Sequence, residues 1–309
     1  MSVLDRIRET FGGASSAAPA APGLSRGEVE QRLAGPERSL AGQNLSGAAL
    51  AGMDLSGADL SRADLRRAVL KGADLSRANL SGAELANADF TGATLTGADL
   101  SRACMQDADF TGAAMQGAVL RDANTLRTGA QNPPVLEGVN LDGADATGAD
   151  FTRANLRDAV LTHARFVESS LHRADLTGVR AAGAQMGGAN LRHAVADGAD
   201  FTGAGLEAAD LASLQAFEAR LGGARLARAN LSGAKLERAD LTGADLSDAI
   251  LEDARLGSAV LRGAVLTHAD LGGADLAGVE LVGVDFRTCH NRPRQAAAGV
   301  GTKATVGAV

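Results

Sequence analysis

The sequence predicts an all-β solenoid, a chain wound into stacked coils, and three observations lead to it. A large apolar residue recurs every five positions from Leu40 to Phe286, with one interruption. Ala stands two positions before this repeat centre in 39 of 49 units, and the centre is Leu in 35 of them. The 309 residues include 39 Gly but no Trp or Tyr, which suits many thin, similar layers better than one varied core.

The typical unit is Ala58-Asp59-Leu60-Ser61-Arg62, and its period of five matches neither an α-helix nor a straight strand. In an extended unit, Ala and Leu point to one side and the Asp between them points to the other. The chain must bend after each Leu, since a straight continuation would turn the next Ala outward. Gly and Asn, frequent at the last place of the unit, suit that bend. Ala and Leu then always face the inside of a coil.

This unit resembles that of the pentapeptide repeat family. The resemblance covers residues 38–286 and implies a right-handed quadrilateral β-helix with four units per coil. The 49 units then give about 12 coils, and about 4.8 Å between stacked strands gives a rod about 58 Å long.

The sequence divides into four parts. Residues 1–24 are predicted to form a flexible N-terminal segment and linker. Residues 25–37 hold a capping helix over about 26–34, because Ser25-Arg26-Gly27-Glu28 has the spacing of a capping box. Residues 38–286 are the β-helix, and residues 287–309 are expected to be a flexible basic tail.

Two departures from the repeat are candidate contact regions. Residues 126–135 break the register by one inserted residue, and Pro133 and Pro134 lack the N–H of a stacked strand. We interpret a surface loop, with Asn132, Pro133 and Pro134 as candidate interaction residues; a bulge without a role is the alternative.

The second departure keeps the register. Leu214 takes the small-residue place and Ala216 the centre, which predicts a volume swap and leaves Phe217 outside as a candidate contact residue. The helical spacing of Leu211, Leu214, Phe217 and Leu221 indicates a short helical turn as the alternative.

The residue types do not favour an enzyme. No Ser/His/Asp or Cys/His arrangement has a reason to come together, and we expect no cofactor. The carboxylates before the repeat centres, as at Asp54, Asp59, Asp64 and Asp74, lack the spacing of calcium motifs, so we expect solvated side chains and no metal. Two Cys, Cys104 and Cys289, are too few for a disulfide framework.

One basic cluster is a candidate site for an anion or an acidic partner segment. His172 and Arg173 precede Arg192 and His193 by 20 residues, and Arg153 lies a further 20 before Arg173, so four units per coil would stack them on one wall. Chance clustering on a charged surface is the alternative.

Charge and hydropathy narrow the partners. A net charge of -7 argues against direct nucleic-acid binding. No apolar run suits membrane insertion or a signal peptide, so a cytoplasmic protein is expected. The last coil is apolar at Val279, Val284 and Phe286, which permits a homodimer through the C-terminal coil.

The predicted function is a non-enzymatic protein–protein interaction rod or scaffold with an unknown protein partner. The resemblance implies two alternatives: a DNA-mimicking binder of a type II topoisomerase (gyrase) that confers protection from quinolone-type inhibitors, and a secreted effector or secretion-associated accessory protein. Acidic belts that alternate with arginines, as between Asp200 and Arg238, make a poor copy of a duplex.

Overall fold

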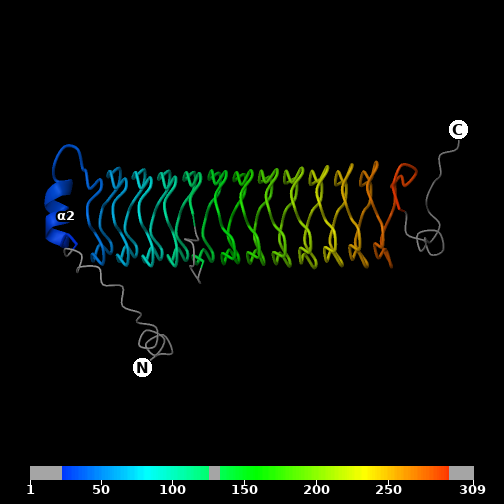
Figure 1. The fold of residues 1–309 in the computed structure, drawn as a ribbon, viewed down its shortest axis with the longest axis horizontal. Coiled ribbons are helices and arrows are strands. Elements are labelled where there is room, and N and C mark those ends of the chain that lie inside the picture. The colour runs from blue at the N-terminus through cyan, green and yellow to red at the C-terminus, as the bar shows by residue number, and fades with distance from the viewer. Residues whose placement is uncertain (1–22, 125–132, 292–309) are drawn as a thin grey trace, which may run out of the picture.

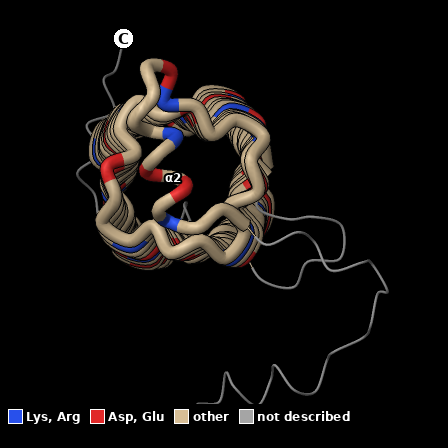
Figure 2. Tube along the Cα trace, turned by 90° about the vertical axis from the view of Figure 1, so that its left-hand side faces the viewer, with Lys and Arg blue, Asp and Glu red and all other residues tan. Residues whose placement is uncertain are grey.

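The computed structural model describes residues 23–124 and 133–291, which form a straight rod with one helix at its N-terminal end (Figure 1). Parallel bridges join residues 20 positions apart, as between Ser39 and Asp59 or between Asp245 and Val265. Four units therefore make one coil, and the coil seen end-on has four walls (Figure 2). The predicted solenoid is confirmed. Within the described residues each wall contributes a single bridging residue per coil, and no longer strand forms.

The five amides of the unit Ala58–Arg62 show how the coils are joined. Two donate to the next coil, one to the preceding coil, one to the previous repeat centre and one to a side chain of the unit. The bonds are Leu60 N to Asn79 O (2.7 Å), Arg62 N to Ser81 O (2.9 Å), Asp59 N to Arg38 O (3.1 Å), Ala58 N to Leu55 O (3.0 Å) and Ser61 N to Asp59 Oδ1 (3.0 Å). Every amide is satisfied, as the interior of a stack requires.

The Asp or Asn before each repeat centre has a structural task that the sequence analysis missed. Its Oδ1 accepts the amide two residues later, at 2.9 Å from Asp54, 3.1 Å from Asp64 and 2.8 Å from Asp74. These carboxylates close Asx turns at the bends, so the expectation of merely solvated side chains is wrong. Asp and Asn recur because a short acceptor must reach that amide.

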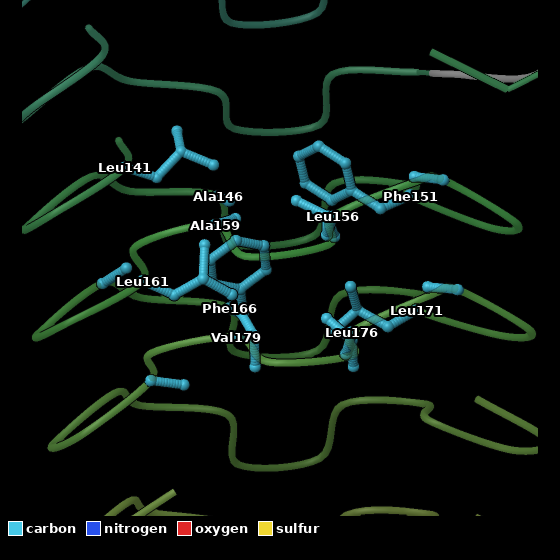
Figure 3. Close-up of a cluster of buried hydrophobic side chains, with 14 of the residues drawn as sticks. Leu141, Ala146, Phe151, Leu156, Ala159, Leu161, Phe166, Leu171, Leu176 and Val179 are labelled. Atoms are coloured by element: carbon cyan, nitrogen blue, oxygen red, sulfur yellow. The ribbon is translucent and has the colours of Figure 1, made fainter. Parts of the chain in front are cut away.

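The interior is filled by the repeat centres and the Ala residues before them. Leu141, Phe151, Leu156 and Phe166 point inward from successive walls and are fully buried (Figure 3). Where Ala146 takes a centre, Phe166 follows it on the same wall. Larger side chains in neighbouring coils thus pack beside small ones.

Aromatic centres also stack from coil to coil. The rings of Phe90 and Phe110 lie parallel, 4.7 Å between centroids. The rings of Phe151 and Phe166, on adjacent walls, are tilted with 5.5 Å between centroids. Both pairs lie inside the coil and are inaccessible to a partner.

The break in register is larger than predicted. Asp109 bridges to Val135, which is 26 residues on where other bridges span 20, so the coil gains six residues rather than one. Pro134 is buried in the small-residue place, and the ladder resumes with Val135 N donating to Ala108 O (3.0 Å). In other units that place donates only within a turn, as Ala58 does to Leu55, so a proline there costs no bond between coils.

The second departure is a volume swap, as predicted. Leu214 is 2% exposed and Ala216 is fully buried, whereas Phe217 is 41% exposed. Gln215 bridges to Val195 and Lys235 in register. The alternative, a short helical turn, is wrong because the ladder continues through these residues.

The N-terminal end is capped by α2 (Arg26–Leu33), which lies across the opening of the first coil (Figure 2). The Ser25 side chain accepts from the Glu28 amide, and the Glu28 side chain accepts from the Ser25 amide. Val29 and Leu33 are buried against the core. The predicted capping helix is confirmed.

The C-terminal coil extends beyond the predicted boundary at Phe286. Cys289 is 8% exposed, and its Sγ donates to Leu266 O (3.1 Å). His290 bridges to Asp270. Residues 287–291 therefore belong to the coil, and the rest of the predicted tail, like the predicted linker up to residue 22, lies outside the described residues.

Candidate interaction surface

The outer surface of the rod consists of the bridging residues on four walls and the turns at the four edges between them. On one edge, three consecutive turns carry Thr152–Arg153, His172–Arg173 and Arg192–His193; we call these six residues the basic edge. Arg153 N donates to His172 O (2.8 Å) and Arg173 N to Arg192 O (2.9 Å), so the turns lie on adjacent coils. The structure brings these candidates together; their role as contacts stays a prediction.

The basic edge carries little compensating charge. Arg192 pairs with Asp210 at 3.3 Å, whereas Arg153 and Arg173 make no ion pair with any described residue. The His172 and His193 rings meet edge-on, 5.7 Å between centroids. Partial burial, followed by the charges of Arg173, His193 and Arg192, lowers the pKa of His172 from its ordinary value. The local field is positive.

The break in register opens on this same edge. Asn124 and Val135, on either side of the break, bridge to Asp150 and Asn155, which flank Thr152–Arg153 in the next coil. Of the three candidates in the break, Asn132 lies outside the described residues and Pro133 is half-buried. Pro134 is buried in the core, so the prediction that it is a contact residue is wrong.

Phe217 is the one candidate on another edge. The Arg238 guanidinium lies 5.5 Å from the centre of its ring and also pairs with Glu218 at 3.0 Å. The Phe217 amide donates to Asp197 Oδ1 (2.9 Å). The ring is thus partly covered by a cation, and its free part can contact a partner.

The acidic belt around Asp200 to Glu218 is largely neutralised by arginines one coil away, an arrangement that the sequence analysis missed. The pairs are Asp200 with Arg220 (3.1 Å), Glu207 with Arg225 (2.8 Å) and Glu218 with Arg238 (3.0 Å). Opposite charges 18 or 20 residues apart are the signal that could have revealed them, once four units per coil are assumed.

Several exposed apolar side chains also escaped the sequence analysis. They occupy the bridging place or a turn rather than a centre, which is the signal for them. They are Val69, Val135, Ile250, Val265 and Val282. Across the described ranges, no group of His, Cys, Asp and Glu is arranged to hold a metal ion, and no helix is long and apolar enough to cross a membrane.

Fold and surface together define a class of protein: a solenoid with a closed apolar interior and all its polar side chains on repeating outer walls and edges. The sequence matches the profile of pentapeptide repeats over residues 44–82, 73–112, 103–124, 135–173, 174–212, 217–253 and 254–290. The chain belongs to the pentapeptide repeat family.

Solved structures of pentapeptide repeat proteins are similar in sequence. HetL from the cyanobacterium Nostoc sp. strain PCC 7120, involved in heterocyst differentiation regulation, is 30% identical over 87% of this chain and 98% of its own, with a TM-score of 0.22. Rfr23 from the cyanobacterium Cyanothece 51142 is 32% identical over 34% and 63%, with a TM-score of 0.21. QnrB1, a plasmid-mediated fluoroquinolone resistance protein, is 20% identical over 80% and 91%, with a TM-score of 0.23. A comparison with curated proteins gives no match.

Acid is expected to destabilise the rod through its turn carboxylates. Hydrogen bonds from Arg66 lower the pKa of Asp64, and those from Ser56 lower the pKa of Asp54. A carboxyl whose pKa is lower in the folded state stabilises it above the unfolded value, near 3.8, and this stabilisation is lost as the pH falls through the folded value. Thermal melting followed by circular dichroism should show the midpoint falling below about pH 4.

Asp64→Asn is the matched variant for this measurement. Asn79 already accepts a turn amide, from Ser81 at 3.0 Å, so an amide side chain fits the place without titrating. The variant should show a smaller fall in melting midpoint between pH 5 and 3 than the wild type. An unchanged fall would mean that Asp64 does not contribute to it.

Proposed function

We propose that this chain is a non-enzymatic interaction rod that binds protein partners along its outer walls and edges. The observation that carries this proposal is the arrangement of the described side chains. The repeat centres between Leu40 and Leu276 are buried in one core, and the charged groups are spread over the outside. An extended surface without a concave pocket suits the recognition of another macromolecule.

The rigidity of the rod supports the same proposal. Hydrogen bonds between coils recur in each unit, as from Leu60 to Asn79 and from Leu226 to Asp245. A stack of this kind holds surface groups at fixed spacings, so a partner can bind with little loss of conformational entropy in the rod. We also infer the right-handed coil of about 12 turns that the repeat count implies.

Photo-crosslinking in the native host tests the proposal. Benzoylphenylalanine replaces one exposed residue on each of the four edges: Arg173, Phe217, Arg228 and Thr242 in four single variants. At least one variant should give a discrete cross-linked partner, identified by mass spectrometry and confirmed by reciprocal capture. Four folded variants without any discrete partner would overturn the proposal, as would turnover of a substrate by the purified chain.

The gyrase alternative makes a different prediction. The ion pairs that neutralise the acidic belt, such as Asp200 with Arg220, weaken its likeness to a duplex that carries about one charge per 1.7 Å. We therefore expect no inhibition of gyrase supercoiling at high micromolar concentration of the full chain. Inhibition would favour the topoisomerase alternative. A homodimer through the C-terminal coil, where Val282 is exposed, stays a prediction.

A further inference from the structure

The basic edge is a site of local charge that the rest of the chain does not balance. Its three turns follow one another on adjacent coils through the bonds from Arg153 to His172 and from Arg173 to Arg192. Two coil steps at about 4.8 Å place the first and last turns about 10 Å apart. Five of its six residues are Arg or His, on a chain with a net charge of -7.

The two unpaired guanidinium groups lie at the tips of their turns. Arg153 and Arg173 adopt φ values of 63° and 58° and are exposed. The acids nearest in sequence are engaged elsewhere: Asp150 Oδ1 accepts from the Thr152 amide, and Asp175 pairs with Arg157. Arg192 alone has a carboxylate partner, Asp210. Both free guanidinium groups can therefore donate to an incoming anion.

The ends of the basic edge limit the length of the anion. Further along the same edge, the turns carry Gln106–Asp107 toward the N-terminus and, past two neutral turns, Glu252–Asp253 toward the C-terminus. A long polyanion such as a nucleic acid would run from Arg and His onto these carboxylates. An extended peptide rises about 3.3 Å per residue, so about three to five residues span the basic edge.

We propose that the basic edge binds a short acidic segment, a run of Asp or Glu in an extended stretch of a partner protein. This inference rests on the proposed function and names the chemistry of one partner. Arg153 and Arg173 bind carboxylates directly, Arg192 shares its guanidinium with Asp210, and His172 and His193 lie between them. The site is distinct from the acidic belt and from Phe217, which lie on other coils or another edge.

Acidic conditions strengthen this binding. His172 faces Arg173, Arg192 and His193, and these positive groups, together with partial burial, lower its pKa. A bound carboxylate offsets that repulsion and favours the protonated ring, so binding of the anion and of a proton are coupled. Affinity should therefore rise as the pH falls from about 7.5 to about 5.5.

The test measures binding of labelled peptides to the full chain by fluorescence anisotropy at about 0.15 M salt, where long-range attraction is screened. The probe is a fluorescein-labelled peptide with five consecutive Glu flanked by Gly. Matched probes replace the Glu run with Gln or with phosphoserine, and a further probe is a short DNA duplex. The Glu peptide should bind at least about tenfold more tightly than the Gln peptide.

The variant is the double change Arg153→Glu and Arg173→Glu. Glu168 and Glu218 adopt the same positive φ, 57° and 56°, so Glu fits these turns. The control is Arg62→Glu with Arg228→Glu, two arginines with the same backbone conformation on a different edge and without a described ion pair. The basic-edge variant should lose about tenfold or more in affinity and the control less than about twofold. Equal circular dichroism and melting show that both are folded.

Three results would overturn the inference: equal binding of the Glu and Gln peptides, an equal loss in both double variants, or tighter binding of duplex DNA or of the phosphoserine peptide than of the Glu peptide. His172→Asn should reduce the rise in affinity at low pH while leaving binding at pH 7.5 within about twofold. Failure of the Glu peptide while the crosslinking variants still capture partners would remove only the basic edge. Failure of both would remove the interaction rod as well.

Discussion

Phe110→Ala is expected to lower the free energy of unfolding by about 3–5 kcal/mol. Phe110 is fully buried, and its ring stacks on that of Phe90 in the preceding coil, 4.7 Å between centroids. The change removes buried apolar area and leaves a cavity that the neighbouring coils cannot close, because the ladder of backbone bonds fixes their spacing. Equilibrium denaturation followed by circular dichroism measures the effect.

Phe217→Ala is the matched control, since the same atoms are removed from a side chain that is 41% exposed. It loses only the contact with Arg238, so its cost should stay below about 1 kcal/mol. If the two variants lost equal stability, the assignment of Phe110 to the interior and of Phe217 to the surface would be contradicted.

Ala114→Pro should cost about 3 kcal/mol or more even though it changes an outward side chain. The Ala114 amide donates to Ala93 O at 2.9 Å, and its carbonyl accepts from Leu95 N at 2.6 Å. Proline removes the first bond, and its fixed ring disturbs the second. Hydrogen exchange should show lost protection in the amides around residues 93–95 and 114 and in the coils that stack on them.

Ala114→Thr separates this backbone effect from the change of side chain. Thr94 occupies the same place one coil earlier and bridges to Ala114, so a Thr fits there. We expect a change within about 0.5 kcal/mol. A loss as large as that of the proline variant would show that the outward side chain, rather than the bond between coils, is the sensitive element.

The sequence predicted the fold closely because one pattern repeats throughout. Ala and Leu two apart, with a bend after each Leu, placed the core residues inside, including the swap at Leu214 and Ala216. The capping box at Ser25 and Glu28 also predicted α2 within one residue. These features depend on local backbone chemistry, which is visible in a single unit.

Other features depend on which residues meet between coils, and these were missed or misread. A break of six residues and a break of one leave the same phase in a repeat of five, so only the bridge from Asp109 to Val135 distinguishes them. The place of Pro134 followed from the same ambiguity. At the C-terminus, Cys289 fills the small-residue place without being Ala, so the repeat seemed to end too early.

The candidate surface was predicted in part. Twenty residues per coil placed His172 beside His193, and the rings do meet. The sequence could not show that Arg192 is shared with Asp210 while Arg173 is not, because side-chain directions at the turns decide this. It also could not show that the break opens on the same edge as Arg153.

The central claim is that residues four units apart stack one coil apart along a straight rod. Pulsed electron paramagnetic resonance between two nitroxides tests it most directly, with Cys104→Ala and Cys289→Ala as background. Arg62→Cys is combined with Glu168→Cys or with Arg228→Cys; all three residues are exposed on one edge, five and eight coil steps apart. Stacking at about 4.8 Å per coil predicts separations of about 24 Å and 38 Å. A distance that does not lengthen from the first pair to the second would contradict the rod and the surfaces assigned on it.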